Sequence, residues 1–267
     1  MPLPTRYRPP VRQVPHIPDV GVCPQGRVVI TEGVTDRHGT DTPRPVSRRE
    51  FPGVHCGSRG AECLECPPVE LIFVRHGLPE RVETDDGSPA DPPLSEIGRA
   101  QAEAAGRWLA EEGLHAVYSS PLRRAFQTAE PIAAAQDLEI VVRDGISEFD
   151  RHSDSYIPME ELKATDYERW RALVQGGYNM STDDPTEFQR LVVATVEQII
   201  ESHRGQRVAV VCHGGVINAY FAHVLGREPG DIFFCDVGYT SISRIAAAST
   251  GQRSLVSLNE RAHLRGM

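Results

Sequence analysis

The sequence predicts an α/β protein with three layers, in which helices cover both faces of a mostly parallel central sheet. From residue 69 onward, short apolar runs of strand length alternate with longer stretches of helical periodicity, the pattern of strand–helix–strand units. Two of these runs, at 71–74 and 208–212, lead directly into Arg75-His76-Gly77 and His213-Gly214. Ligands of open parallel sheets bind beyond the carboxyl ends of the strands. If the two strands are neighbours, they bring both histidines to one site.

The first 68 residues differ from the rest of the chain. They hold 12 of the 21 prolines and little hydrophobic periodicity, and proline at this density opposes helices and interior strands. We expect residues 1–68 to be a disordered or loosely packed extension, or upstream sequence included by a misplaced start, and residues 69–267 to form the folded domain. A zinc knuckle of His55, Cys56, Cys63 and Cys66 is the alternative, although this spacing differs from the usual pairs of zinc ligands.

The elements of the domain follow from local patterns. Strands are expected at 70–74, 115–119, 139–142 and 208–212, and later at 232–235, 241–246 and 253–257. Helices are expected at 96–112, 121–136, 160–174, 185–203 and 215–225, with Ser95 and Asp184 as caps and Pro121 at a helix start. In the first helix the expected buried stripe is Ile97, Ala100, Ala104, Trp108 and Leu109.

Charge and cysteine usage narrow the function. The formal net charge is −9, and the nine arginines and seven acidic residues of the first 68 residues leave −11 on the remainder. An acidic body does not attract nucleic acid through its general field, so an anionic substrate needs a local cluster of Arg and His.

We expect no membrane partner because no run of 18 apolar residues occurs. Residues 1–20 lack the apolar core of a secretory signal, and Cys212 and Cys235 are typical of buried thiols, so we expect a cytoplasmic location.

The tripeptide Arg-His-Gly occurs twice, at 37–39 and at 75–77. In a chain with ten histidines a bare tripeptide is weak evidence. The first copy lies among turn-forming residues, whereas the second follows an apolar run of buried-strand length. The second copy is therefore the candidate functional motif.

Three segments together resemble the signatures of the histidine phosphatase superfamily, which includes cofactor-dependent phosphoglycerate mutase and many small phosphatases. They read VRHG at 74–77, YSSPLRRAFQTA at 118–129 and VCHGGVI at 211–217. A fourth, PLSEIGRAQA at 93–102, resembles the family's helix after the first strand. All four keep the family's order and spacing over residues 69–225. The resemblance implies a phosphoglycerate mutase-like fold and phosphoryl transfer through a phosphohistidine.

The resemblance assigns the nucleophile to His76, and a neutral imidazole suits that task near pH 7. It assigns phosphate binding to Arg75 and Arg124, whose planar guanidinium groups match phosphate oxygens. His213, if protonated, is a third cationic donor. No metal or other cofactor is expected, because these groups supply the positive charge that phosphoryl transfer needs.

Two glycines complete the expected phosphate site, and the neighbouring Arg123 is expected outside it. Gly77 and Gly214 follow the two histidines and are expected beside the phosphate, where they leave room for its approach. Arg123 points away from Arg124 on a helix, so we expect it to be a surface residue or an outer substrate contact.

Leaving-group protonation requires an acid. The family has a glutamate after the third strand, and Glu148 matches it here. It can protonate the departing alkoxide and then deprotonate the water that hydrolyses the phosphohistidine. Nearby arginines lower the pKa of a carboxyl group, so the acid role requires some desolvation. Asp150 is the alternative acid.

Within the family, we expect a phosphatase that acts on a small phosphorylated substrate. Residues 78–83 (LPERVE) and 156–161 (YIPMEE) do not resemble the segments of the mutases. A phosphoglycerate mutase and a non-catalytic phospho-ligand-binding relative are the alternatives. A cap insertion is expected around 151–180, where aromatic side chains either contact the leaving group or pack between helices. A homodimer is expected only by analogy with the family.

Overall fold

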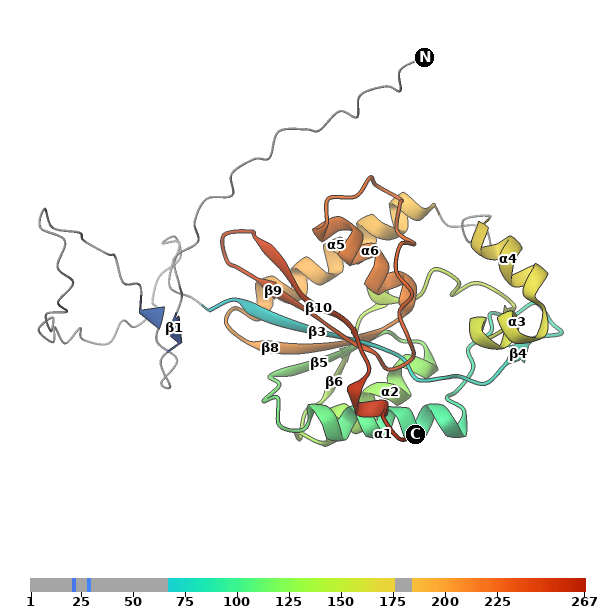
Figure 1. Ribbon diagram of the computed structural model, residues 1–267, viewed down its shortest axis with the longest axis horizontal. Coiled ribbons are helices and arrows are strands. Elements are labelled where there is room, and N and C mark those ends of the chain that lie inside the picture. Colours follow the sequence, from blue (N-terminus) through green and yellow to red (C-terminus); the bar gives the residue numbers. More distant parts are fainter. Residues whose placement is uncertain (1–20, 23–27, 30–66, 176–183) are drawn as a thin grey trace, which may run out of the picture. The chain divides into compact units, whose positions relative to one another are not determined.

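The computed structural model describes residues 21–22, 28–29, 67–175 and 184–267 (Figure 1). The chain divides into two compact units, residues 1–57 and 58–267. In the first unit the described residues form one antiparallel pair, β1 (Gly21–Val22) with β2 (Val28–Val29). The expected zinc ligands lie outside the described residues. Within the described ranges, no helix has the length and apolar character needed to cross a membrane.

The second unit is built on a six-stranded sheet with the order β10-β9-β3-β8-β5-β6. Its strands are β3 (Val69–Arg75), β5 (Ala116–Ser119), β6 (Ile140–Val142), β8 (Arg207–Cys212), β9 (Ile242–Ala247) and β10 (Arg253–Glu260). The four strands from β3 to β6 in this order run parallel, and β9 runs antiparallel to both of its neighbours. The mostly parallel sheet expected from the sequence is therefore confirmed.

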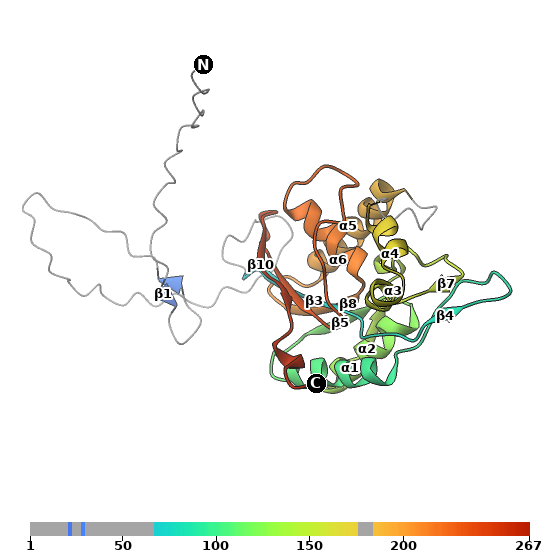
Figure 2. The same ribbon diagram turned by 45° about the vertical axis from the view of Figure 1, so that its right-hand side comes forward.

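Helices cover both faces of this sheet (Figures 1 and 2). One layer holds α1 (Glu96–Leu109) and α2 (Arg123–Ala134), and the other holds α5 (Pro185–Ser202) and α6 (Gly214–Val224). Successive side chains of a strand point to opposite faces. Accordingly Leu71 and Phe73 join the core under α5 and α6, whereas Ile72 and Val74 join the core under α1 and α2. The three-layer prediction is confirmed.

The central pairing of β3 with β8 positions the candidate site. The two strands are adjacent and parallel, with Arg75 opposite Cys212. The backbone N–H of His76 donates to the carbonyl of Cys212 at 2.9 Å. His76 and His213 therefore follow the carboxyl ends of two adjacent strands, at the same end of the sheet, as the sequence predicts.

The buried face of α1 differs from the expected stripe. Ala104 and Leu109 are buried, but Ile97 is 60% exposed and Trp108 is 48% exposed. The face that packs inward is built from small residues, including Gly98, Ala102, Ala105 and Gly106. A Cβ on Gly106 would lie 2.8 Å from the carbonyl oxygen of Pro131 in α2. Close contact between the two helices thus selects small residues, which hydrophobic periodicity alone does not reveal.

Two other predictions of secondary structure are wrong. The expected helix at 160–174 is two helices, α3 (Met159–Thr165) and α4 (Tyr167–Gln175). They separate at Asp166. The side chain of Asp166 accepts the N–H of Arg169 and thereby caps the start of α4. The helix expected to start at Pro121 begins at Arg123.

The expected strand at 232–235 is not a strand, because the side chain of Asn218, rather than a neighbouring strand, makes hydrogen bonds to its backbone. Asn218 Oδ1 accepts the N–H groups of Phe234 and Cys235, and Asn218 Nδ2 donates to the carbonyl of Cys235. Cys235 is consequently half-buried rather than a core thiol, whereas Cys212 is fully buried.

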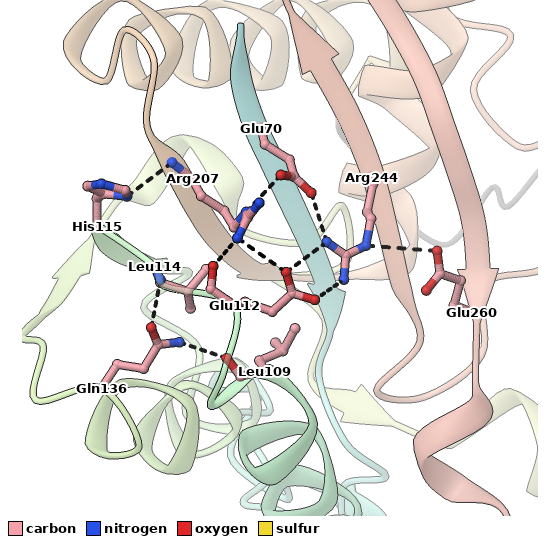
Figure 3. Close-up of polar contacts among 9 residues, drawn as sticks. All are labelled: Glu70, Leu109, Glu112, Leu114, His115, Gln136, Arg207, Arg244 and Glu260. Carbon is pink, nitrogen blue, oxygen red and sulfur yellow. Dashed lines mark hydrogen bonds and ion pairs between the residues drawn. The ribbon is translucent and has the colours of Figure 1, made fainter. Parts of the chain in front are cut away.

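An ion-pair network joins three strands at the end of the sheet opposite His76 and His213 (Figure 3). Glu70 on β3 accepts from Arg207 on β8 at 2.7 Å and from Arg244 on β9 at 2.8 Å. Arg244 also pairs with Glu112 at 2.6 Å. Burial acts to raise the pKa of Glu70, but the hydrogen bonds from the two arginines outweigh it and the pKa is lowered. The network therefore stabilises the strand order when Glu70 is ionised.

We expect Glu70→Gln to lower the free energy of unfolding at pH 7 by about 1 to 2 kcal/mol, because it removes the charge shared by two arginines. Urea unfolding measures this loss. Since the pKa of Glu70 is lowered in the folded state, the difference from wild type narrows as the pH falls through that pKa. Glu187→Gln is the matched control and should have a much smaller effect, since Glu187 and Arg190 form a solvent-exposed pair. Equal losses in both variants would contradict the stabilising role.

Candidate active site

A cavity of about 440 Å³ opens beside the carboxyl ends of β3 and β8. The expected site residues Arg75, His76, Arg124, Glu148 and Gly214 all line it. His213 lies behind this lining, with its ring centroid 5.0 Å from that of His76. Arg123 is exposed, does not line the cavity and donates its backbone N–H to Asp91. The fold thus brings together residues that are far apart in the chain.

His76 is almost completely buried and has a defined tautomer. Its Nδ1 lies 2.8 Å from the carbonyl oxygen of Gly77. A carbonyl oxygen only accepts, so Nδ1 carries the proton and Nε2 keeps its lone pair. Burial, followed by the charges of Arg124 and Arg75, holds the pKa of His76 well below its ordinary value. The imidazole is therefore neutral at neutral pH, which is the nucleophilic form.

His213 is fully buried and hydrogen-bonded to a residue that sequence reasoning did not single out. Its Nε2 lies 2.8 Å from Oγ of Ser120, which also accepts the N–H of Leu122 at 3.3 Å. Nδ1 of His213 is buried with no hydrogen-bond partner among the described residues. Burial, and then the neighbouring charges of Arg124 and Arg75, lower the pKa of His213 well below its ordinary value. The protonated His213 considered from the sequence is thus disfavoured in the free protein.

Each arginine of the site lies against a tyrosine ring. The guanidinium carbon of Arg75 is 3.9 Å from the ring centroid of Tyr239, and that of Arg124 is 4.5 Å from the ring centroid of Tyr156. Arg124 is 1% exposed, and within the described part of the chain its Nε is buried without a hydrogen-bond partner. A buried guanidinium with donor capacity to spare is suited to bind an anion.

The two candidate acids differ in their contacts. Glu148 accepts backbone N–H groups from Phe149 at 2.9 Å and from Gly215 at 3.0 Å. Burial, and then the nearby charge of Asp150, raise the pKa of Glu148 above its ordinary value despite these hydrogen bonds. Asp150 instead pairs with Arg124 Nη2 at 3.2 Å. The desolvation that an acid role requires is therefore present at Glu148.

Gly77 packs closely against a neighbouring helix. Its N–H donates to Oγ1 of Thr128 at 2.9 Å, so this amide is already engaged. A Cβ on Gly77 would lie 2.6 Å from the carbonyl oxygen of Gly98 in α1. Gly214 differs, because a Cβ there would make only an ordinary contact, 3.7 Å from Nε of Arg75. Gly77 is therefore in close contact with α1, and its expected place beside the phosphate stays a prediction.

Sequence reasoning assigned no role to Ser120, Thr128 or Tyr239, and it considered Tyr156 only among the aromatic side chains around 151–180 that contact the leaving group or pack between helices. Ser120 and Thr128 lie inside the segment 118–129 already singled out, so their motif membership was the available signal. Tyr156 reaches the cavity because β7 (Ser155–Tyr156) pairs with β4 (Val82–Glu83). Tyr239 precedes β9 and lies 5.6 Å, ring to ring, from His76. No local sequence pattern points to Tyr239, and tertiary contacts bring both tyrosines to the arginines.

Residues 71–261 match the model of the histidine phosphatase superfamily (branch 1). The chain therefore belongs to this superfamily, in agreement with the motifs and with the geometry of the two histidines. Phosphoserine phosphatase 1 of Hydrogenobacter thermophilus is 33% identical over 180 residues, which cover 63% of this chain and 82% of that protein.

Two further relatives bear on architecture. A bifunctional protein of Mycobacterium tuberculosis is 31% identical over 217 residues, and the match spans 78% of this chain but only 57% of the relative. A crystal structure of a phosphoserine phosphatase mutant from Entamoeba histolytica, in complex with phosphoserine, superposes with a TM-score of 0.58 at 23% identity. The superposed residues cover 73% of this chain and 99% of the chain in that structure. At this identity the likeness establishes the shared fold.

Two glycine substitutions should separate packing from site geometry. Gly98→Ala places a Cβ against the backbone carbonyl of Leu78, which cannot move aside. We expect it to lower the free energy of unfolding by about 2 kcal/mol, measured by urea denaturation. Gly215→Ala places a Cβ against the carboxylate of Glu148, the mobile end of a side chain.

Gly215→Ala should therefore retain most of its stability while its crystal structure shows Glu148 displaced from the backbone N–H of residue 215. An unmoved carboxylate would show that Gly215 does not set the position of Glu148. A stability loss as large as that of Gly98→Ala would assign Gly215 to packing instead.

Proposed function

We propose that this protein is a phosphatase that hydrolyses a small phosphomonoester through a phosphohistidine on His76. The observation that carries the proposal is the state of His76: neutral, buried, held in one tautomer and adjacent to two arginines. Membership in the superfamily and the similarity to a protein named phosphoserine phosphatase support it. Arg75 and Arg124 would hold the phosphoryl oxygens, since planar donors stabilise the charge that develops on them.

In the first step, the Nε2 lone pair of His76 forms a bond to phosphorus as the bond from phosphorus to the ester oxygen breaks. Glu148 gives its proton to the departing oxygen, which leaves as an alcohol. In the second step, water attacks phosphorus, Glu148 takes a proton from that water, and the bond between phosphorus and nitrogen breaks. Inorganic phosphate leaves, and His76 regains its lone pair. Nδ1 keeps its proton throughout, hydrogen-bonded to Gly77.

His213, oriented by Ser120, would complete the oxyanion contacts. If the hydroxyl of Ser120 donates to Nε2 of His213, then Nδ1 of His213 carries a hydrogen, and this buried Nδ1 has no hydrogen-bond partner among the described residues. A neutral His213 can donate that hydrogen to a phosphoryl oxygen. Gly214, at the start of α6, lies near enough to Arg75 to border the same phosphate.

The mutase alternative differs in its acceptor, because a mutase returns the phosphoryl group to a second substrate hydroxyl and must exclude water. The segments at 78–83 and 156–161 do not resemble those of mutases, which favours water as the acceptor. Interconversion of phosphoglycerates much faster than their hydrolysis would replace the phosphatase proposal. A cap formed by residues around 151–180, a cytoplasmic location and a homodimer stay predictions from the sequence.

We expect His76→Ala to lower kcat for p-nitrophenyl phosphate by at least about 10³-fold, because it removes the covalent nucleophile. Rapid-quench measurements with radiolabelled substrate should trap a phosphoenzyme in wild type and none in the variant. His223→Ala, at the exposed end of α6, is the matched control. Similar activity of His76→Ala and wild type would rule out the mechanism.

The identity of the acid can be tested with leaving groups of different basicity. Glu148→Gln should slow an alkyl phosphate by at least about 10²-fold and p-nitrophenyl phosphate much less, because only the basic alkoxide needs a proton. In wild type, kcat/KM for the alkyl phosphate should fall as the pH rises through the raised pKa of Glu148, and the variant should lose this limb. Asp150→Asn is the comparison, and the same selective loss there instead would transfer the acid role to Asp150.

A further inference from the structure

We propose, on the basis of the function above, that the physiological substrate carries a bulky apolar leaving group with an aromatic ring. More of the cavity's lining surface is apolar than polar. His76, Arg75 and Arg124 account for the phosphoryl group, and Lys163 and Asp236 are among the other polar residues of the lining. The volume of about 440 Å³ lies within the range of pockets that enclose drug-sized ligands. A phosphoryl group with a short polar alcohol would leave much of this cavity to water.

The apolar wall comes from two segments distant in sequence. The stretch after α6 supplies Phe233, Phe234 and Val237, and the stretch from β7 to α4 supplies Ile157, Met159 and Trp170. Phe233 is 36% exposed and meets Phe149, another lining residue, edge to face at 6.1 Å. Large apolar side chains gathered in one concave site mark a surface that binds an apolar group.

Trp170 is held in a defined orientation within this wall. Tyr167 stacks on its ring at 5.3 Å, and the ammonium of Lys163, the only lysine of the chain, lies 4.6 Å from the ring centroid. An aromatic side chain fixed by such contacts offers a large contact area at a low cost in conformational entropy. A planar apolar group of the substrate is the chemistry that matches Trp170 and Phe233 together.

The test compares 3-phenylpropyl phosphate with propyl phosphate. Both are primary alkyl phosphates with similar leaving-group basicity, so they differ mainly in the ring that reaches the wall. We expect the ring to raise kcat/KM by at least about 30-fold. The non-hydrolysable pair 4-phenylbutylphosphonate and butylphosphonate, compared by calorimetry, should show a similar ratio of Kd values.

The two measurements keep this inference separate from the proposed function. Equal Kd and kcat/KM values with and without the ring would overturn the aromatic leaving group, while His76-dependent hydrolysis of both esters would still support a phosphatase. Tighter binding of the ring without turnover of either ester would support the pocket and overturn the proposed function.

Substitutions locate the effect on the wall. Trp170→Ala should lower the ring preference by about tenfold. Phe233→Ala, from the opposite segment, should lower it as well, which guards against a local folding defect in α4. Trp108→Ala is the matched control, because the other tryptophan of the chain lies half-exposed on α1, where it contacts His263. A ring preference that is unchanged in both wall variants, or that falls equally in Trp108→Ala, would contradict the assignment.

Discussion

The parallel pairing of β3 with β8 is the contact on which the candidate site depends. Its register sets Arg75 opposite Cys212, so each strand ends within one residue of its histidine. Because strands in a sheet lie close to 4.8 Å apart, the two imidazoles have little freedom to separate, and their ring centroids are 5.0 Å apart. The two helical layers and the Glu70 network hold this pairing from both faces and from the opposite end of the sheet.

Positive charge concentrated in a buried place is the consequence of that pairing. Arg124 is almost fully buried and pairs with Asp150, and Arg75 lies nearby. Burial, and then the charges of the two arginines, disfavour ionising either histidine as a third or fourth charged group, so both histidines have lowered pKa values. In the proposed mechanism the arginines also attract the phosphoryl dianion, because they retain their charge at all ordinary pH values. They thus contribute both to the neutral state of His76 and to binding of the phosphoryl group.

The carboxylates balance this charge in different ways. Asp150 forms an ion pair with Arg124 and so offsets part of its positive charge. Glu148 accepts two backbone N–H groups, and burial raises its pKa. The absence of a side chain at Gly215 makes room for Glu148. Glu148 and Asp150 are only two residues apart, yet Asp150 is an ion-pair partner and Glu148 is the candidate acid. Residue type alone does not distinguish the two, which is why both were open from the sequence.

The sequence by itself determined the layered α/β fold, the strand ends that bear His76 and His213, and the motif that contains Arg124, because periodicity and strand-end motifs are local signals. It misjudged the buried face of α1 and the strand at 232–235, and it did not indicate the packing of Gly77 against α1. Only the tertiary structure decided these, since each depends on a partner distant in sequence: α2 for Gly106, Asn218 for Cys235, and Gly98 for Gly77. The contacts of Ser120, Tyr156 and Tyr239 with the site arose in the same way, from elements that meet only after the sheet has formed.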